Sequence, residues 1–217
     1  MKKLIEQMGE KIRKLRWACW IKLWVLAALF RGAWRQKKAF VNDNVEGLTT
    51  YFRPNDISVI GDSSANHLAQ RMREYTRVTN FARNGSTIED WMDSPILDGQ
   101  HHVVVLAIGG NDIGLLGKNV VDVMESHYEL FLKIKAEDVI VIGLSPVNGT
   151  EGFAPHKNSV IRNVNYVLKL LYRDNFIDTW PPMMLPSFTD GVHHTLHYDK
   201  QIIEAVKDRI LAIYQKR

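Results

Sequence analysis

The sequence contains a single cysteine, Cys19. One cysteine cannot form a disulfide within the chain, and it excludes a zinc site built from several cysteines. Internal repeats and low-complexity tracts are also absent. The fold must therefore be stabilised by a buried apolar core, and apolar residues make up 46% of the 217 residues, as is usual for a globular protein. This length corresponds to about one α/β domain, with or without an appended segment.

The larger part of the chain also lacks an excess of basic residues. Residues 51–217 contain 17 Lys and Arg against 20 Asp and Glu, whereas residues 1–50 contain 11 against 4. The net charge of +4 therefore comes from the N-terminal segment. Because the rest of the chain has no surplus of positive charge, we do not expect it to bind nucleic acid.

The N-terminal segment has no apolar run of the roughly 20 residues that a membrane span requires. Apolar residues recur every three or four positions from Leu4 to Trp34, which predicts a long helix within residues 1–40. Its most apolar part, Trp17 to Phe30, contains Lys22, and basic residues flank both sides. This pattern favours contact with a membrane surface through residues 11–38, as an interfacial helix or as a span in a locally thinned bilayer.

Another interpretation is a helix that packs on the rest of the chain or on a partner chain. No small-residue cleavage site follows the apolar run, so a removable signal peptide is not favoured. Basic residues on both flanks leave the side of the membrane open. We expect a membrane-associated protein, or otherwise a cytoplasmic one, whose oligomeric state the sequence does not indicate.

After a connector, residues 41–55, the chain alternates between strand and helix patterns and forms one domain, residues 56–217. The continuous apolar runs of the strands, separated by helices, predict a parallel sheet covered on both faces. The expected strands are 57–60, 78–82, 102–108, 139–144 and 176–178. The expected helices are 65–75, 120–134, 157–173 and 200–214.

Polar clusters follow three of these strands, at residues 61–64, 83–86 and 109–112. The carboxyl ends of parallel strands lie at one edge of a sheet, where ligands bind in such folds. Ser63 lies in Gly61-Asp62-Ser63-Ser64, a tight turn that exposes its hydroxyl at a helix N-terminus. Taken alone, these residues also suit an ordinary turn and helix cap.

Two further residues in these clusters are candidates for stabilising an oxyanion. Gly85 could bring its backbone N–H close to a bound oxyanion, and the Asn111 side-chain amide could donate to the same oxyanion. Asp112 could hold the loop by accepting hydrogen bonds from nearby backbone N–H groups. Each of these residues also suits a simple polar turn.

Asp190 and His193 form an Asp-x-x-His pattern just before the last predicted helix. An acid three residues before a histidine can bind the imidazole Nδ1 and fix its tautomer, which leaves Nε2 to take a proton from a serine hydroxyl. His194 is a rival to His193. A metal site is not favoured, because His193, His194 and His197 lack a carboxylate or cysteine set at zinc spacing.

Together, these blocks resemble the SGNH hydrolase family, also called GDSL esterases and lipases. The blocks are Gly61-Asp62-Ser63-Ser64, Asn84-Gly85, Gly109-Gly110-Asn111-Asp112 and Asp190-Gly191-Val192-His193, and the resemblance spans about residues 56–214. One departure is Ser64, where leucine is usual in the family. The family's spacing selects His193 over His194.

The resemblance implies a flavodoxin-like, three-layer α/β/α sandwich with a parallel central sheet. It also implies a serine esterase that hydrolyses carboxylic esters without a cofactor or metal. Ser63, His193 and Asp190 would be the catalytic triad, and the backbone N–H groups of Ser63 and Gly85 with the Asn111 side chain would form the oxyanion hole. Asp62 and Asp112 would support the site.

The substrate is a small ester whose identity the sequence leaves open. A compact domain without a recognisable lid favours small acyl groups such as acetyl, whereas the N-terminal helix favours lipid esters; glycan O-acyl groups are a further option. An acyltransferase would use the same triad, and a non-catalytic membrane-anchored binding module would keep the same fold.

Loops 86–98 and 145–156 are candidates for substrate contact. Four side chains in these loops could form walls of the site or could be ordinary packing: Trp91, Met92, Phe153 and His156. The segment from Trp180 to Pro186 could line the approach to His193 or stiffen its loop.

Overall fold

The structure, a computed structural model, describes residues 57–99, 101–149, 153–180, 190, 192–193 and 196–215. The predicted N-terminal helix, the connector, His194 and most of the segment from Trp180 to Pro186 lie outside these residues. Membrane contact through residues 11–38 therefore remains a prediction of the sequence. Among the helices of the described part, none is both long enough and apolar enough to cross a bilayer.

The centre of the fold is a sheet of five parallel strands in the order β2-β1-β3-β4-β5. The strands span Ile57–Gly61 (β1), Val78–Asn80 (β2), His101–Ala107 (β3), Ala136–Ile142 (β4) and Phe176–Ile177 (β5). Every residue of β1 and β3 is buried. Burial on both faces explains why these strands appear in the sequence as continuous apolar runs rather than as alternating patterns.

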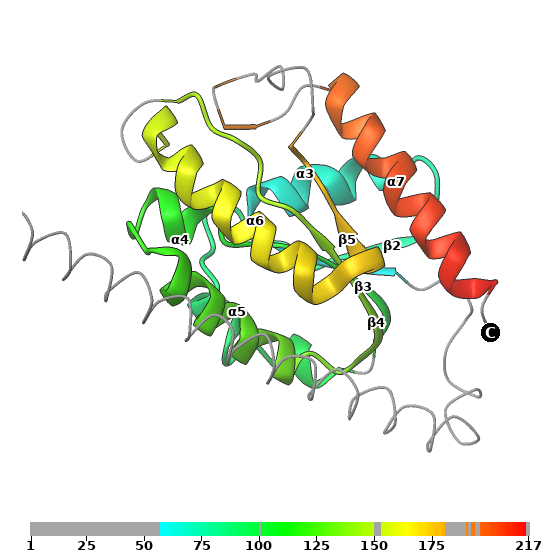
Figure 1. Ribbon diagram of the computed structural model, residues 1–217. Helices are drawn as coiled ribbons and strands as arrows, with labels where there is room; N and C mark the ends of the chain where they lie inside the picture. The colour runs from blue at the N-terminus through cyan, green and yellow to red at the C-terminus, as the bar shows by residue number, and fades with distance from the viewer. Residues whose placement is uncertain are drawn as a thin grey trace, which may run out of the picture.

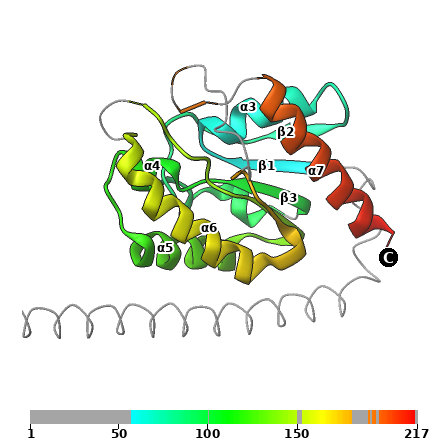
Figure 2. The ribbon, with the colours of Figure 1, turned by 45° about the horizontal axis from the view of Figure 1, so that its top comes forward.

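Helices cover the two faces of the sheet (Figures 1 and 2). The helices α3 (Ser63–Met72) and α7 (Leu196–Tyr214) lie on one face, and α4 (Gly110–Gly114), α5 (Val120–Lys133) and α6 (Asn158–Tyr172) lie on the other. The apolar side chains form a separate core cluster on each face: Val103 and Val105 of β3 belong to one cluster, and Val104 and Leu106 belong to the other. The predicted three-layer α/β/α architecture is confirmed.

Element boundaries differ from the predictions mainly near the site. The helix α3 begins at Ser63 rather than at residue 65, because the Asp62 side chain caps it, and α7 begins at residue 196 rather than 200. The short helix α4 was not predicted. Four short 3-10 helices span Glu89–Trp91 (η1), Pro95–Asp98 (η2), Pro155–Lys157 (η3) and Arg173–Asn175 (η4).

The chain adds β2 on one side of β1 and the later strands on the other side. The chain runs from β1 outward to β2, then returns to place β3 on the other side of β1. The loops after β1 and β3 diverge at this point and leave a crevice at the carboxyl edge of the sheet, which is where open α/β sheets bind their ligands. The clusters that begin at Gly61 and Gly109 both lie at this edge.

Candidate active site

The turn from β1 to α3 places Ser63 at the first position of a helix. Gly61 has φ +148°, and a Cβ there would lie 1.8 Å from the carbonyl oxygen of Ala107, so only glycine allows the two strands to approach this closely. Asp62 then accepts a hydrogen bond from the Ser64 N–H at 2.9 Å and caps α3. Burial of the Asp62 carboxyl raises its pKa to about 6.

Ser63, His193 and Asp190 are joined by hydrogen bonds in series. The Ser63 Oγ lies 2.8 Å from His193 Nε2, and His193 Nδ1 lies 2.6 Å from Asp190 Oδ2. The two ends of the series are far apart in the chain, since Ser63 and His193 are separated by 130 positions. The structure thus brings together the three residues that the sequence singled out, with each imidazole nitrogen facing the predicted partner.

Asp190 is fixed by the backbone of its own turn. Its Oδ1 accepts hydrogen bonds from the N–H groups of His193 at 2.7 Å and Val192 at 3.0 Å. The hydrogen bonds from the His193 backbone and ring hold the pKa of Asp190 well below its usual range. An ionised carboxylate at Nδ1 favours the tautomer in which Nε2 can accept the Ser63 proton.

The loop after β2 is bound to the ends of β1 and β3. The Arg83 N–H donates to the Gly61 carbonyl at 2.9 Å, and the Asn111 Nδ2 donates to the Ser86 carbonyl at 2.9 Å. Gly85 lies between these contacts with φ +76°, and no atom beyond the adjacent residues lies within 4 Å of the position of a Cβ there. The two predicted oxyanion donors are therefore close in the fold, since Asn111 is bonded to Ser86, the residue that follows Gly85.

Asp112 binds the loop after β2, rather than only its own turn, through its carboxylate. Its carboxylate is fully buried and accepts hydrogen bonds from the Ile88 N–H and from Lys118 Nζ, each at 3.0 Å. Lys118 also contacts Glu89 at 2.8 Å. The carboxylate thus ties α4 to the loop that carries Gly85, and the lysine supplies the charge that a buried carboxylate needs.

Two residues that the sequence interpretation did not single out, Asn66 and His67, also hold the site, together with Trp91, which it had proposed as a substrate contact. Asn66 of α3 donates to the Asn84 side chain at 2.9 Å and so connects α3 to the Gly85 loop. His67 packs on the ring of His193. Trp91 is fully buried and donates through Nε1 to the Ser86 hydroxyl at 3.1 Å. For Asn66 and His67, the signal was their spacing of three and four residues from Ser63, which places them on its helix face.

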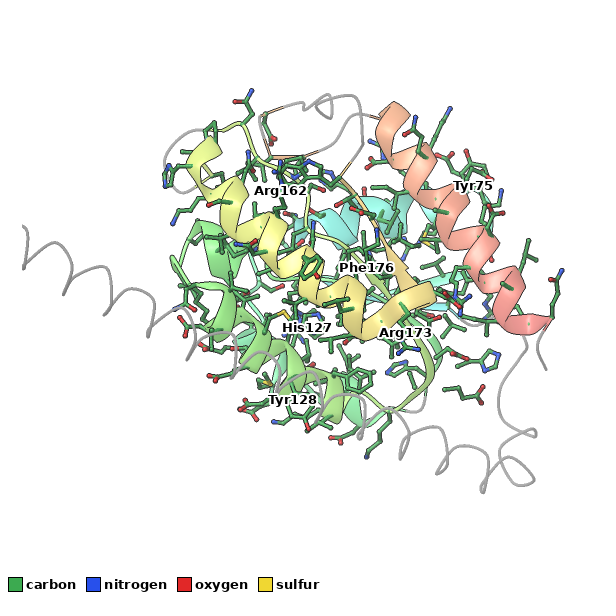
Figure 3. The ribbon with its side chains drawn as sticks, in the orientation of Figure 1. Tyr75, His127, Tyr128, Arg162, Arg173 and Phe176 are labelled. Carbon is green, nitrogen blue, oxygen red and sulfur yellow. The ribbon has the colours of Figure 1, made fainter. Side chains whose placement is uncertain are left out.

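A cleft opens beside these residues, with Asp62, Ser64 and Val192 in its lining. Further walls are apolar side chains from α4, from the segments after β3 and β4 and from α6: Ile108, Ile113, Leu144, Val147, Phe153 and Ile161. Of the proposed wall residues, Phe153 lines the cleft, whereas Trp91 is buried, Met92 packs against the core, and His156 is exposed. The Trp180 ring lies under the Arg162 guanidinium at 4.8 Å, and Figure 3 shows Arg162 on α6.

The described residues contain no group of three or more His, Cys, Asp or Glu side chains arranged to hold a metal ion.

Comparison with solved structures relates this arrangement to known folds. A member of the lipolytic G-D-S-L family from Veillonella parvula superposes with a TM-score of 0.57 at 16% identity, covering 70% of this chain and 96% of that one. This chain has the G-D-S-L fold. A carbohydrate esterase family 3 protein from Talaromyces cellulolyticus superposes with a TM-score of 0.58 at 12% identity over 75% and 99% of the two chains.

A third similar structure is an aryl esterase from M. smegmatis, which superposes with a TM-score of 0.58 at 14% identity over 73% of this chain and 99% of that one. No protein-family model and no curated protein matches this sequence. At these identities the similarity concerns the fold, and it covers nearly the whole length of each of these structures.

Proposed function

We propose that this chain is a member of the SGNH hydrolase family and a serine esterase that hydrolyses carboxylic esters. The observation that supports this most directly is the continuous series from Ser63 Oγ through the His193 imidazole to the Asp190 carboxylate, with distances of 2.8 Å and 2.6 Å. A serine hydroxyl is a weak nucleophile unless a base accepts its proton, and here a histidine of fixed tautomer lies within reach. The solved structures that share the fold include an aryl esterase and a carbohydrate esterase.

In the proposed reaction, Ser63 Oγ attacks the ester carbonyl carbon as His193 Nε2 takes the hydroxyl proton. The carbonyl oxygen becomes an oxyanion, which the backbone N–H groups of Ser63 and Gly85 and the Asn111 Nδ2 would stabilise. His193 then gives its proton to the leaving alcohol, and an acyl group remains on Ser63. A water molecule activated by His193 releases the acid and restores the serine.

The apolar cleft beside Ser64 and Val192 suits the acyl part of such a substrate. Burying a methylene group there is favourable by about 0.8 kcal/mol. We propose that the acyl group occupies this cleft and that the alcohol part, whether a small alcohol, a lipid or a glycan, leaves toward solvent. A membrane surface bound through residues 11–38 would supply lipid esters directly to the site.

The test is covalent labelling of the purified protein with a fluorophosphonate probe, together with hydrolysis of p-nitrophenyl acetate. We expect the wild-type protein to be labelled on Ser63 and to hydrolyse the ester, and we expect Ser63→Ala to lose both. Ser159→Ala, an exposed serine near the start of α6, serves as the matched control and should keep both. A Ser63→Ala protein that still hydrolysed the ester would remove the nucleophile from this proposal.

A further inference from the structure

The ring of His193 is in contact with a second histidine. The ring centroids of His67 and His193 lie 4.8 Å apart, and the ring planes are inclined by 33°. We propose that His67 is a positioning residue that holds the His193 imidazole in line with Ser63. This inference rests on the proposed esterase function, since it assigns His67 a role in the same reaction.

The contact follows from the spacing of residues along α3. Ser63, His67 and Arg71 are each four residues apart, so their side chains lie on one face of the helix. Ser63 binds the edge of the His193 ring through Nε2 at 2.8 Å, and His67, one turn later, contacts the ring itself. Arg71 forms an ion pair with the buried Asp199 of α7 at 2.7 Å. One face of α3 therefore contacts the turn of His193 and the helix that follows this turn, and α3 and α7 lie side by side in Figure 2.

Asp190 cannot hold His193 against α3 by itself. It belongs to the same turn as His193, so the two residues move together, and its side chain is 54% exposed. Asp190 orients the ring within the turn, whereas the position of the whole turn relative to Ser63 depends on contacts with α3. The ring of His67 provides such a contact beside the hydrogen bond itself. A misplacement of about 1 Å between nucleophile and base can cost about 100-fold in rate.

The charge of His67 must also be compatible with the reaction, because His193 becomes positive during it. The ionisable groups that interact with His67 are His193 and Asp190 of the adjacent turn, Asp199 of α7 and Arg71 of α3. Burial, and next the proximity of His193, lower the pKa of His67. The lowered pKa favours the uncharged form of His67, so what it supplies is a ring rather than a charge.

This distinction sets the choice of variants for a kinetic test. In His67→Ala the ring is lost, and we expect kcat/KM for p-nitrophenyl acetate to fall about 10- to 100-fold, mainly through kcat, because His67 is not expected to bind the substrate. In His67→Phe an uncharged ring remains, and we expect kcat/KM within about threefold of wild type. Tyr166→Ala, which removes an exposed ring from α6, is the control and should match wild type. Thermal unfolding of each variant identifies any loss that comes from misfolding.

Equal kcat/KM in His67→Ala and wild type would overturn the positioning role. Equal losses in His67→Ala and His67→Phe would also overturn it, because the ring would then not be the feature that matters.

A second measurement does not depend on esterase activity. NMR titration of the histidine ring protons gives the pKa of His67 in the wild type and in His193→Gln. Protonated His193 disfavours a second positive charge nearby, so its removal should raise the pKa of His67. An unchanged His67 pKa would show that the rings are not in contact, and it would overturn the inference even if the protein is an esterase. If the pKa of His67 is higher in His193→Gln than in wild type, but the wild-type protein neither hydrolyses esters nor reacts with the probe, the contact is confirmed, whereas the proposed function and the positioning role are both overturned.

Discussion

At the scale of single residues, the Asn111 amide carries two N–H groups. One N–H donates to the Ser86 carbonyl at 2.9 Å and so anchors the loop that carries Gly85. In the proposed reaction the second would donate to the oxyanion, since an amide nitrogen carries two donors. Asn111 is buried, so such a hydrogen bond would compete little with bulk water.

We predict that Asn111→Ala lowers kcat for p-nitrophenyl acetate by about 10²–10³, which is the usual cost of removing one oxyanion donor. Steady-state kinetics measure this directly. Asn163→Ala, an exposed asparagine of α6, is the matched control and should leave kcat unchanged. A loss smaller than about tenfold in Asn111→Ala would mean that the oxyanion is stabilised by other groups.

Much of the residue-scale site could be predicted from the sequence because its chemistry follows local patterns. Asp190 and His193 lie three residues apart, so one turn brings the carboxylate to the ring, and Gly-Asp-Ser at a strand end predicts an exposed serine. Asn66 and His67 were not predicted, because polar residues on a helix are common on any exposed face. Their partners, Asn84 and His193, become neighbours only when the helix is packed in place.

At the scale of elements, Asp62 determines where α3 begins. Its carboxylate caps the helix through the Ser64 N–H, yet it is buried, and its pKa is raised from 3.8 to about 6. In the unfolded chain the same carboxyl ionises near its ordinary pKa. The Asp62 carboxyl therefore stabilises the folded state fully below about pH 4. This stabilisation, about 3 kcal/mol, is lost as the pH rises to about 6.

We predict that Asp62→Asn increases the free energy of unfolding at pH 7 by about 1–3 kcal/mol and changes it much less at pH 4. The amide oxygen still caps the helix, since asparagine is as good a cap as aspartate, but no charge is buried. Urea unfolding at the two pH values measures this. The comparison variant Asp62→Ala also loses the cap and should be less stable than Asp62→Asn by about 1 kcal/mol. If Asp62→Asn is less stable than wild type at pH 7, the buried charge is favourable there and this account of Asp62 is wrong.

At the scale of the whole molecule, burial shifts the pKa of a second group in the direction opposite to that of Asp62. His127 of α5 lies in the core between α5 and α6, with its Nδ1 3.4 Å from the Tyr172 hydroxyl (Figure 3). Burial lowers the pKa of His127 from 6.5 to about 4. The unfolded chain takes up this proton near pH 6.5, whereas the folded protein resists it, so stability falls as the pH falls from about 6.5 to 4. The contributions of His127 and Asp62 therefore largely offset each other in this range.

We predict that His127→Phe removes the loss of stability that protonation of His127 in the unfolded chain causes at acidic pH. Between pH 7 and pH 4.5, the free energy of unfolding of wild type should fall by about 2–3 kcal/mol more than that of the variant. Any packing cost of the larger ring is the same at both pH values and cancels in this comparison. Urea unfolding curves at the two pH values measure the difference. A parallel pH dependence in wild type and variant would show that His127 takes up its proton in the folded state as readily as in the unfolded chain.

The sequence by itself determined the class of fold and the edge of the sheet at which the site lies. Continuous apolar runs that alternate with helical periods are compatible with a parallel sheet covered on both faces, and all strands of such a sheet end at the same edge. Loops that follow these strands therefore had to meet there, whatever the exact element boundaries.

Only the tertiary structure decided which face of α3 meets His193, across 130 positions of chain, and which side chains hold it there. The physical reason is that periodicity records which face of an element is buried, but not how far one element is shifted or rotated against another. Contacts of the kind between His67 and His193 depend on that placement, which the packing of the whole core sets.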